Sequence, residues 1–105
     1  MSLTRLEKLQ GMLQDSPDDV FLNYALAMEY VSSARKDDAL AAFRRVLSLD
    51  GQHSAAWFQQ AQLLAGMGEF AGARESAANG VAAAKAQGDQ HAAEEIGGFL
   101  ESIPG

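Results

Sequence analysis

The stretch Val20–His53 reads VFLNYALAMEYVSSARKDDALAAFRRVLSLDGQH, and the 34 residues that follow it, Ser54–Gln87, repeat its pattern of residue types. A small residue recurs at this interval, at Ala27 and again at Ala61. A fixed period of roughly 20 to 50 residues indicates a chain built from stacked supersecondary units. The period therefore predicts the architecture before any single element is considered.

Each copy contains two helical segments. The segment from about Asp19 to Ser33 is apolar nearly all round, which predicts a helix that is covered on several sides or presents an apolar surface. The next segment carries an apolar stripe at helical spacing, with Arg44, Arg45 and Ser48 on its outer side. The stripe consists of Ala39, Leu40, Phe43, Val46 and Leu47. Gly51 comes after it and predicts a helix end in the left-handed backbone conformation.

The second copy follows the same plan with smaller side chains. Its first helix is expected to be capped by His53 or Ser54. Its second helix is rich in Ala and Gly, which predicts an interface that is either thin or closely approached. A last helix is predicted from Asp89 to about Ile103. Its apolar side is made of Ile96, Phe99, Leu100 and Ile103. Gly97 and Gly98 should each cost about 1 kcal/mol in a helix, and we expect close packing to compensate at Gly97.

A 34-residue unit of two helices with small residues at fixed places resembles the tetratricopeptide repeat. The residues at that family's marker positions are Leu26, Ala27, Tyr30, Ala39, Phe43, Val46 and Asp50 in the first copy, and Trp57, Ala61, Leu64, Gly68 and Ala73 in the second. The chain departs from the family pattern at Asn23 (usually Trp), Gly51 (usually Pro) and Gln60 (usually apolar). The resemblance covers residues 20–87 and implies an architecture, not a reaction.

We therefore predict an all-α fold, in which five antiparallel helices form helix-turn-helix repeats of the tetratricopeptide type, stacked as an α-α superhelix. Residues 1–105 are expected to form one domain. Its parts are a half-repeat helix over residues 4–16, a first repeat over 20–53, a second repeat over 54–87 and a capping helix over 88–103.

Composition narrows the class of protein. The chain is 48% hydrophobic and 21% charged, it lacks cysteine, and it has no apolar run near the roughly 20 residues of a membrane span. Its start lacks the apolar core of a signal peptide, so we expect a cytoplasmic protein. Eight Lys and Arg against 14 Asp and Glu give a net charge of −6, which disfavours binding to nucleic acid, because basic side chains bind the phosphate backbone. The acids are interpreted as a solvated outer face.

No pattern in the sequence predicts catalysis, a metal site or a cofactor. His53 and His91 are far apart, and although His91 lies near Glu94 and Glu95, adjacent carboxylates point in different directions and no second nitrogen ligand is close in sequence. The chain has no phosphate-binding glycine motif and no nucleophile elbow. We expect a protein that is not an enzyme, and an enzymatic role is kept only as a remote alternative.

The resemblance implies a concave groove lined by the first helix of each repeat. The predicted ligand-binding residues on it are Phe21, Tyr24, Met28, Val31, Phe58 and Gln62. Relatives that hold the C-terminal carboxylate of a peptide use a ring of Lys, Arg and Asn, which these positions lack. The bound segment should therefore contribute apolar anchors. The alternative is that the chain's own terminal helices cover these aromatic residues.

The leading prediction for function is a non-catalytic protein-interaction module, whose apolar concave groove binds a peptide or an amphipathic helix of a partner protein. The second hypothesis is a structural protein that self-associates, because repeat stacks usually need about three units for stability. Nucleic acid, membranes and cofactors are not expected among the partners.

Overall fold

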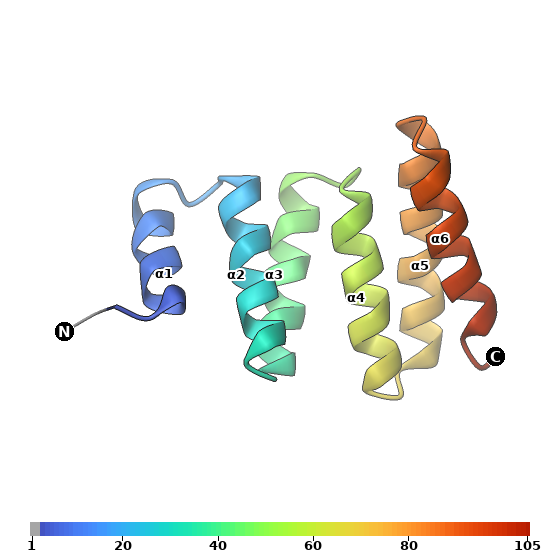
Figure 1. Ribbon diagram of the computed structural model, residues 1–105, viewed down its shortest axis with the longest axis horizontal. Helices are drawn as coiled ribbons and strands as arrows, with labels where there is room; N and C mark the ends of the chain where they lie inside the picture. The colour runs from blue at the N-terminus through green and yellow to red at the C-terminus, as the bar shows by residue number, and fades with distance from the viewer. Residues whose placement is uncertain (1–2) are drawn as a thin grey trace. The chain divides into compact units, whose positions relative to one another are not determined.

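The computed structural model describes residues 3–105, and these form six α-helices (Figure 1). The helices are α1 (Arg5–Asp15), α2 (Val20–Ser32), α3 (Lys36–Leu49), α4 (Ser54–Gly66), α5 (Phe70–Ala86) and α6 (Gln90–Ser102). The all-α prediction is confirmed. The predicted number of five helices is wrong, because a half-repeat helix, two helix pairs and a capping helix make six.

The helices are grouped in two compact units. One unit ends at Asp50 and the other is Gly51–Gly105. In the first unit α2 packs against α1 and α3, and in the second α5 packs against α4 and α6. Each unit thus contains one helix pair and one additional helix. That residues 1–105 act as a single domain stays a prediction.

Polar side chains cap the starts of α1, α2, α4 and α6. At α1 the Thr4 hydroxyl accepts from the Glu7 N–H at 3.1 Å, and the Glu7 carboxylate accepts from the Thr4 N–H at 3.0 Å. This reciprocal pair is a capping box, and the bond from the Thr4 backbone lowers the pKa of Glu7 by favouring its charged form. At α4 the cap is His53, whose Nδ1 accepts from the Ala56 N–H at 3.1 Å. The prediction of His53 or Ser54 as the cap is confirmed.

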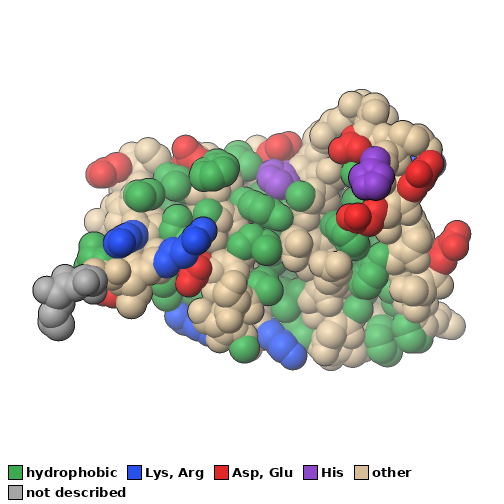
Figure 2. Space-filling view, viewed as in Figure 1, with side chains coloured by type: hydrophobic (Ala, Val, Ile, Leu, Met, Phe, Trp, Pro, Cys, Tyr) green, Lys and Arg blue, Asp and Glu red, His purple; other side chains and the backbone are tan. Residues whose placement is uncertain are grey.

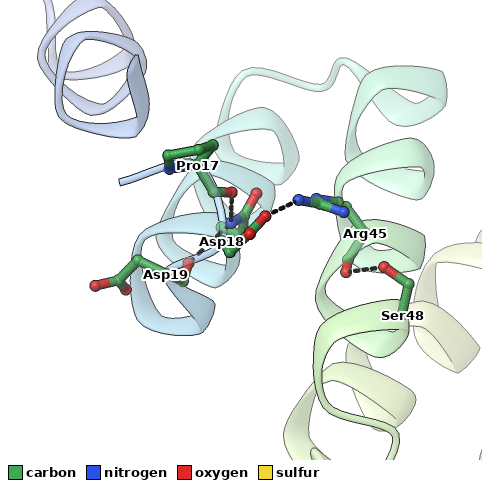
Figure 3. Close-up of polar contacts among 6 residues, drawn as sticks. Pro17, Asp18, Asp19, Arg45 and Ser48 are labelled. Atoms are coloured by element: carbon green, nitrogen blue, oxygen red, sulfur yellow. Dashed lines mark hydrogen bonds and ion pairs between the residues drawn. The ribbon is translucent and has the colours of Figure 1, made fainter. Parts of the chain in front are cut away.

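Asn23, which stands where the family usually has Trp, holds the turn before α2, whose residues Pro17, Asp18 and Asp19 are shown in Figure 3. Its side chain is buried, and its amide donates to the carbonyls of Pro17 at 3.0 Å and Asp19 at 2.8 Å. Asp19 caps the helix, and Asp18 pairs with Arg45 of α3. Hydrogen bonds to the turn therefore replace the packing of a large aromatic side chain at this position.

Two of the helix pairs turn through left-handed residues at equivalent positions of the repeat. Ala34 follows α2 with φ 56°, and Gly68, which occupies the same place in the second copy, follows α4 with φ 79°. Gly88 has φ 72° before α6. The prediction for Gly51 is wrong: α3 ends on Asp50, whose backbone is extended at φ −146°, and Gly51 does not have a positive φ.

Replacing Ala34 with glycine should raise the free energy of unfolding by roughly 0.5–1 kcal/mol. A Cβ atom in the left-handed region costs about 1–2 kcal/mol, and the greater freedom of glycine in the unfolded chain offsets part of that gain. The measurement is urea denaturation followed by circular dichroism. Gly68→Ala is the matched control and should lower stability by a similar amount. An Ala34→Gly variant less stable than the parent would contradict the assigned turn.

Small residues allow the helices of each pair to approach closely. Ala27 on α2 and Ala61 on α4 are both fully buried, as their 34-residue recurrence predicted. The stripe on α3 is confirmed too, since Ala39, Phe43 and Val46 have no exposed surface. These positions form the interface within each pair, where a larger side chain would overpack the core.

The core of the second unit is built around α5. Its buried cluster consists of Ala61, Ala73, Ala77, Ile96 and Ile103. A Cβ atom added at Gly80 would lie 3.1 Å from Trp57 Cβ and 3.4 Å from two side-chain atoms of Ile96, so α4 and α6 both approach the α5 backbone at Gly80. The packing reason proposed for Gly97 is wrong, because a Cβ there would contact only Val81, at 4.0 Å.

Candidate functional site

The six predicted ligand-binding residues are divided between the two units, four on α2 and two on α4. On α2, Phe21 is 77% exposed and Val31 is 38% exposed. Tyr24 and Met28 are half-buried. Phe21, Tyr24 and Met28 are three and four residues apart and so lie on one side of the helix. Figure 2 shows hydrophobic side chains at the surface over α2, as these exposures require.

Tyr24 links this surface to the core of the first unit. Its ring centroid lies 6.1 Å from that of Phe43 on α3, with the planes tilted by 59°. Partial burial raises the pKa of Tyr24, because the charged phenolate loses more favourable solvation on burial than the neutral phenol does. Tyr24 therefore forms the floor of the α2 surface, from which Phe21 projects.

On α4 the two predicted residues have different surroundings. Phe58 is half-buried and packs on the core cluster of its unit, and its ring meets that of Phe99 on α6 edge-to-face at 5.6 Å. Gln62 is exposed. The contact of Phe58 with Phe99 agrees with the alternative hypothesis, in which a terminal helix of the chain, here α6, covers the aromatic residue.

A cavity of about 420 Å³ in the second unit was missed by the sequence analysis. It is lined by Gly51, Gln52, Trp57, Asn79, Ala82, Ala83 and Ala86. The Trp57 Nε1–H donates to the Gly51 carbonyl at 2.8 Å, and the Gln87 amide donates to the Gln52 carbonyl, so two side chains fix the turn before α4. The sequence signal was the single Trp together with closely spaced alanines near the end of α5, where small side chains leave space beside the indole.

A buried polar pair joins α4 and α5. The Gln60 amide donates to Ser76 Oγ at 2.8 Å, and both side chains are buried. Gln60 Oε1 is buried without a hydrogen-bond partner. Gln60, which replaces an apolar residue of the family pattern, therefore has a polar partner in Ser76 on the facing helix. Its unpaired oxygen lowers the free energy of unfolding by about 1–3 kcal/mol.

Within residues 3–105, no group of three or more His, Asp or Glu side chains is placed to hold a metal ion. His91 lies exposed on α6, and the Nδ1 atom of His53 is occupied by the cap of α4. No helix in the described part of the chain has both the length and the hydropathy needed to cross a membrane.

Antiparallel helix pairs with a 34-residue period, joined by short turns, define a helical-repeat protein. No family model matches the chain. The chain is 29% identical over 98 residues to the TPR repeat-containing protein PA0015 of Pseudomonas aeruginosa, and the match covers 93% of each protein.

Solved structures agree with this match. The solution structure of protein BPP2914 from Bordetella parapertussis is similar with a TM-score of 0.82 and 34% identity, over 95% of this chain and 87% of that one. A tetratricopeptide repeat domain protein from Salinibacter ruber matches with a TM-score of 0.75 and 25% identity, over 80% and 85% of the two chains. The chain therefore has a fold of the tetratricopeptide type and is similar over most of its length to proteins named for that repeat.

Proposed function

We propose that this protein is a non-catalytic interaction module that binds a peptide or a helix of a partner protein through the apolar surface of α2. The tetratricopeptide fold is in general a protein-interaction fold. The observation that carries the proposal is Phe21, a large apolar side chain that is 77% exposed in the first turn of α2. Contiguous apolar surface of this kind often marks a contact site.

The predicted residues have different roles in this proposal. Phe21 and Val31 make direct contact with the partner because they are the exposed members. Tyr24 and Met28 form the half-buried floor, with Tyr24 supported by Phe43. On α4, Gln62 is a further contact residue, whereas Phe58 acts from within the core through its contact with Phe99.

The chemistry of the surface selects the kind of partner. The predicted contact positions carry no Lys or Arg side chain, so they offer no counter-charge for a terminal carboxylate or a phosphate. A bound segment must therefore gain its affinity from apolar anchors. Because exposed charge pairs are what salt screens most, binding through this surface should change little with ionic strength.

A selection from a phage-displayed random peptide library tests the proposal. We expect wild-type protein to enrich peptides with apolar or aromatic anchors, and Phe21→Ser to weaken their binding by about 1–3 kcal/mol, as the loss of an anchor does. Titration calorimetry with the selected peptides at two salt concentrations measures both effects.

The matched control is Phe70→Ser, which removes another exposed apolar side chain, at the start of α5. It should leave peptide binding unchanged. Circular dichroism should show both variants folded. If the selected peptides bind Phe21→Ser as tightly as the parent, the α2 surface is not the binding site. A cytoplasmic location stays a prediction, and an enzymatic role stays the remote alternative.

A further inference from the structure

The cavity in the second unit has the size and the walls to accept an aromatic side chain. It is open to the surface, and its volume of about 420 Å³ leaves room for a ring, since roughly 150 Å³ is enough to hold benzene. Its apolar wall is formed by Trp57, Ala82, Ala83 and Ala86, and its polar side by Gly51, Gln52 and Asn79. Aromatic rings pack well on one another in offset or edge-on arrangements, so Trp57 favours an aromatic occupant.

The chain itself carries an aromatic side chain that is available for such a cavity. Phe21 is the most exposed of the large hydrophobic residues in the described chain. It lies in the first turn of α2, directly after the turn that joins α1 to α2. No other large apolar side chain of residues 3–105 combines a ring with this degree of exposure, since Phe70 is only 38% exposed.

One acidic side chain lies beside Phe21 and one basic side chain lies beside the cavity. Phe21 follows Asp18 and Asp19; Asp18 is paired with Arg45, which leaves the exposed Asp19 carboxylate as the net charge at this end of α2. Beside the cavity, Lys85 is a surface neighbour of Ala82, three residues away on α5. The only other base of this unit, Arg74, donates to the Pro104 carbonyl.

We propose that Phe21 of one copy of the protein inserts into the Trp57–Ala82–Ala86 cavity of a second copy, with Asp19 opposite Lys85. This self-association rests on the proposed function, which makes Phe21 a contact residue. It adds that the partner of Phe21 is a second copy of the chain. In the proposed contact the anchor of each copy enters the cavity of the next, which is a heterologous arrangement, so each added copy presents a new anchor and a new cavity. Association should therefore extend with concentration beyond a dimer.

Sedimentation velocity of the full chain over roughly 10 µM to 1 mM, the range in which small interfaces associate, tests this inference. The wild type should show a weight-average mass that increases with concentration and exceeds two chains. Phe21→Ser removes the anchor and Ala82→Glu fills the cavity and adds a carboxylate opposite Asp19. Each variant alone should associate at least about tenfold more weakly, as expected for loss of a central contact.

An equimolar mixture of the two variants gives the sharpest readout. Phe21→Ser retains the cavity and Ala82→Glu retains the anchor, so one contact can form, and the mixture should stop at a heterodimer. Phe70→Ser is the control and should associate like the wild type. Ala86→Glu is a second cavity variant, at another exposed position, and keeps the test valid if Ala82→Glu does not fold.

A wild type that remains monomeric at the highest concentration would overturn the inference. So would single variants that associate like the wild type, or a mixture that remains monomeric. If the protein is monomeric but selects peptides through Phe21, this inference fails and the proposed function stands. If neither peptides nor a second copy depends on Phe21, both fail.

Discussion

Phe43→Ala is expected to lower the free energy of unfolding by about 3–5 kcal/mol, the usual loss for a fully buried phenylalanine. Phe43 has no exposed surface, and its ring meets that of Tyr24 across the contact between α2 and α3. Alanine would leave a cavity at the centre of the first helix pair, since the flanking Ala39 and Val46 are also fully buried. Urea denaturation followed by far-ultraviolet circular dichroism measures the effect.

Two further variants at this place separate packing from other causes. Phe43→Leu keeps most of the volume and should cost less than half as much as the alanine variant. Arg44→Ala changes the next residue, which is exposed on the outer side of α3, and should stay within about 0.5 kcal/mol of the parent. A loss below about 1 kcal/mol for Phe43→Ala would contradict the packing of α2 against α3.

The fold was predictable where it depends on the spacing of small and apolar residues along the chain. The burial of Ala27, Ala61 and Phe43 follows from helical periodicity within a 34-residue unit, because the spacing of side chains on a helix is fixed by backbone geometry. The caps were predictable for the same reason, since Asp19 and His53 bond to amides only three residues away.

Features that depend on partners distant in sequence were not predictable. In the sequence Gln60 is only a departure from the repeat pattern, because its hydrogen-bond partner Ser76 lies on the facing helix. As a glycine inside a helix, Gly97 suggests a close-packed position, but the helix that its neighbours approach closely is α5, at Gly80. Glycine permits a left-handed turn without requiring one, which is why Gly51 was misjudged while the less permissive Ala34 adopts that conformation.

The candidate site shows the same division. That Phe21, Tyr24 and Met28 share one side of a helix follows from their spacing. How much of each is exposed does not, because Phe43 supports Tyr24 and Phe99 covers part of Phe58 from a helix 41 positions further along the chain. A spacing pattern alone assigns the same role to an exposed anchor and to a residue under the capping helix.

Removal of α6 by truncation after Gln87 should unfold the second unit. Ile96 is 1% exposed and Ile103 is 7% exposed, and both belong to the core cluster with Ala61, Ala73 and Ala77. Loss of one buried isoleucine costs about 2–5 kcal/mol, so the loss of both, together with the ring of Phe99 on Phe58, is comparable to the whole stability of a small domain, about 5–15 kcal/mol.

Trp57 provides a specific probe for this result, because it is the single tryptophan and its Nε1–H donates to the Gly51 carbonyl. In a ¹H–¹⁵N correlation spectrum of the truncated chain, the indole resonance should move to the position of an unfolded tryptophan. Truncation after Ile103 is the control: it removes only Pro104 and Gly105 and should preserve the resonance. If truncation after Gln87 changes neither the indole resonance nor the melting transition, α6 does not cap the core. The surface of Ala77, Gly80 and Phe58 would then be exposed without loss of stability.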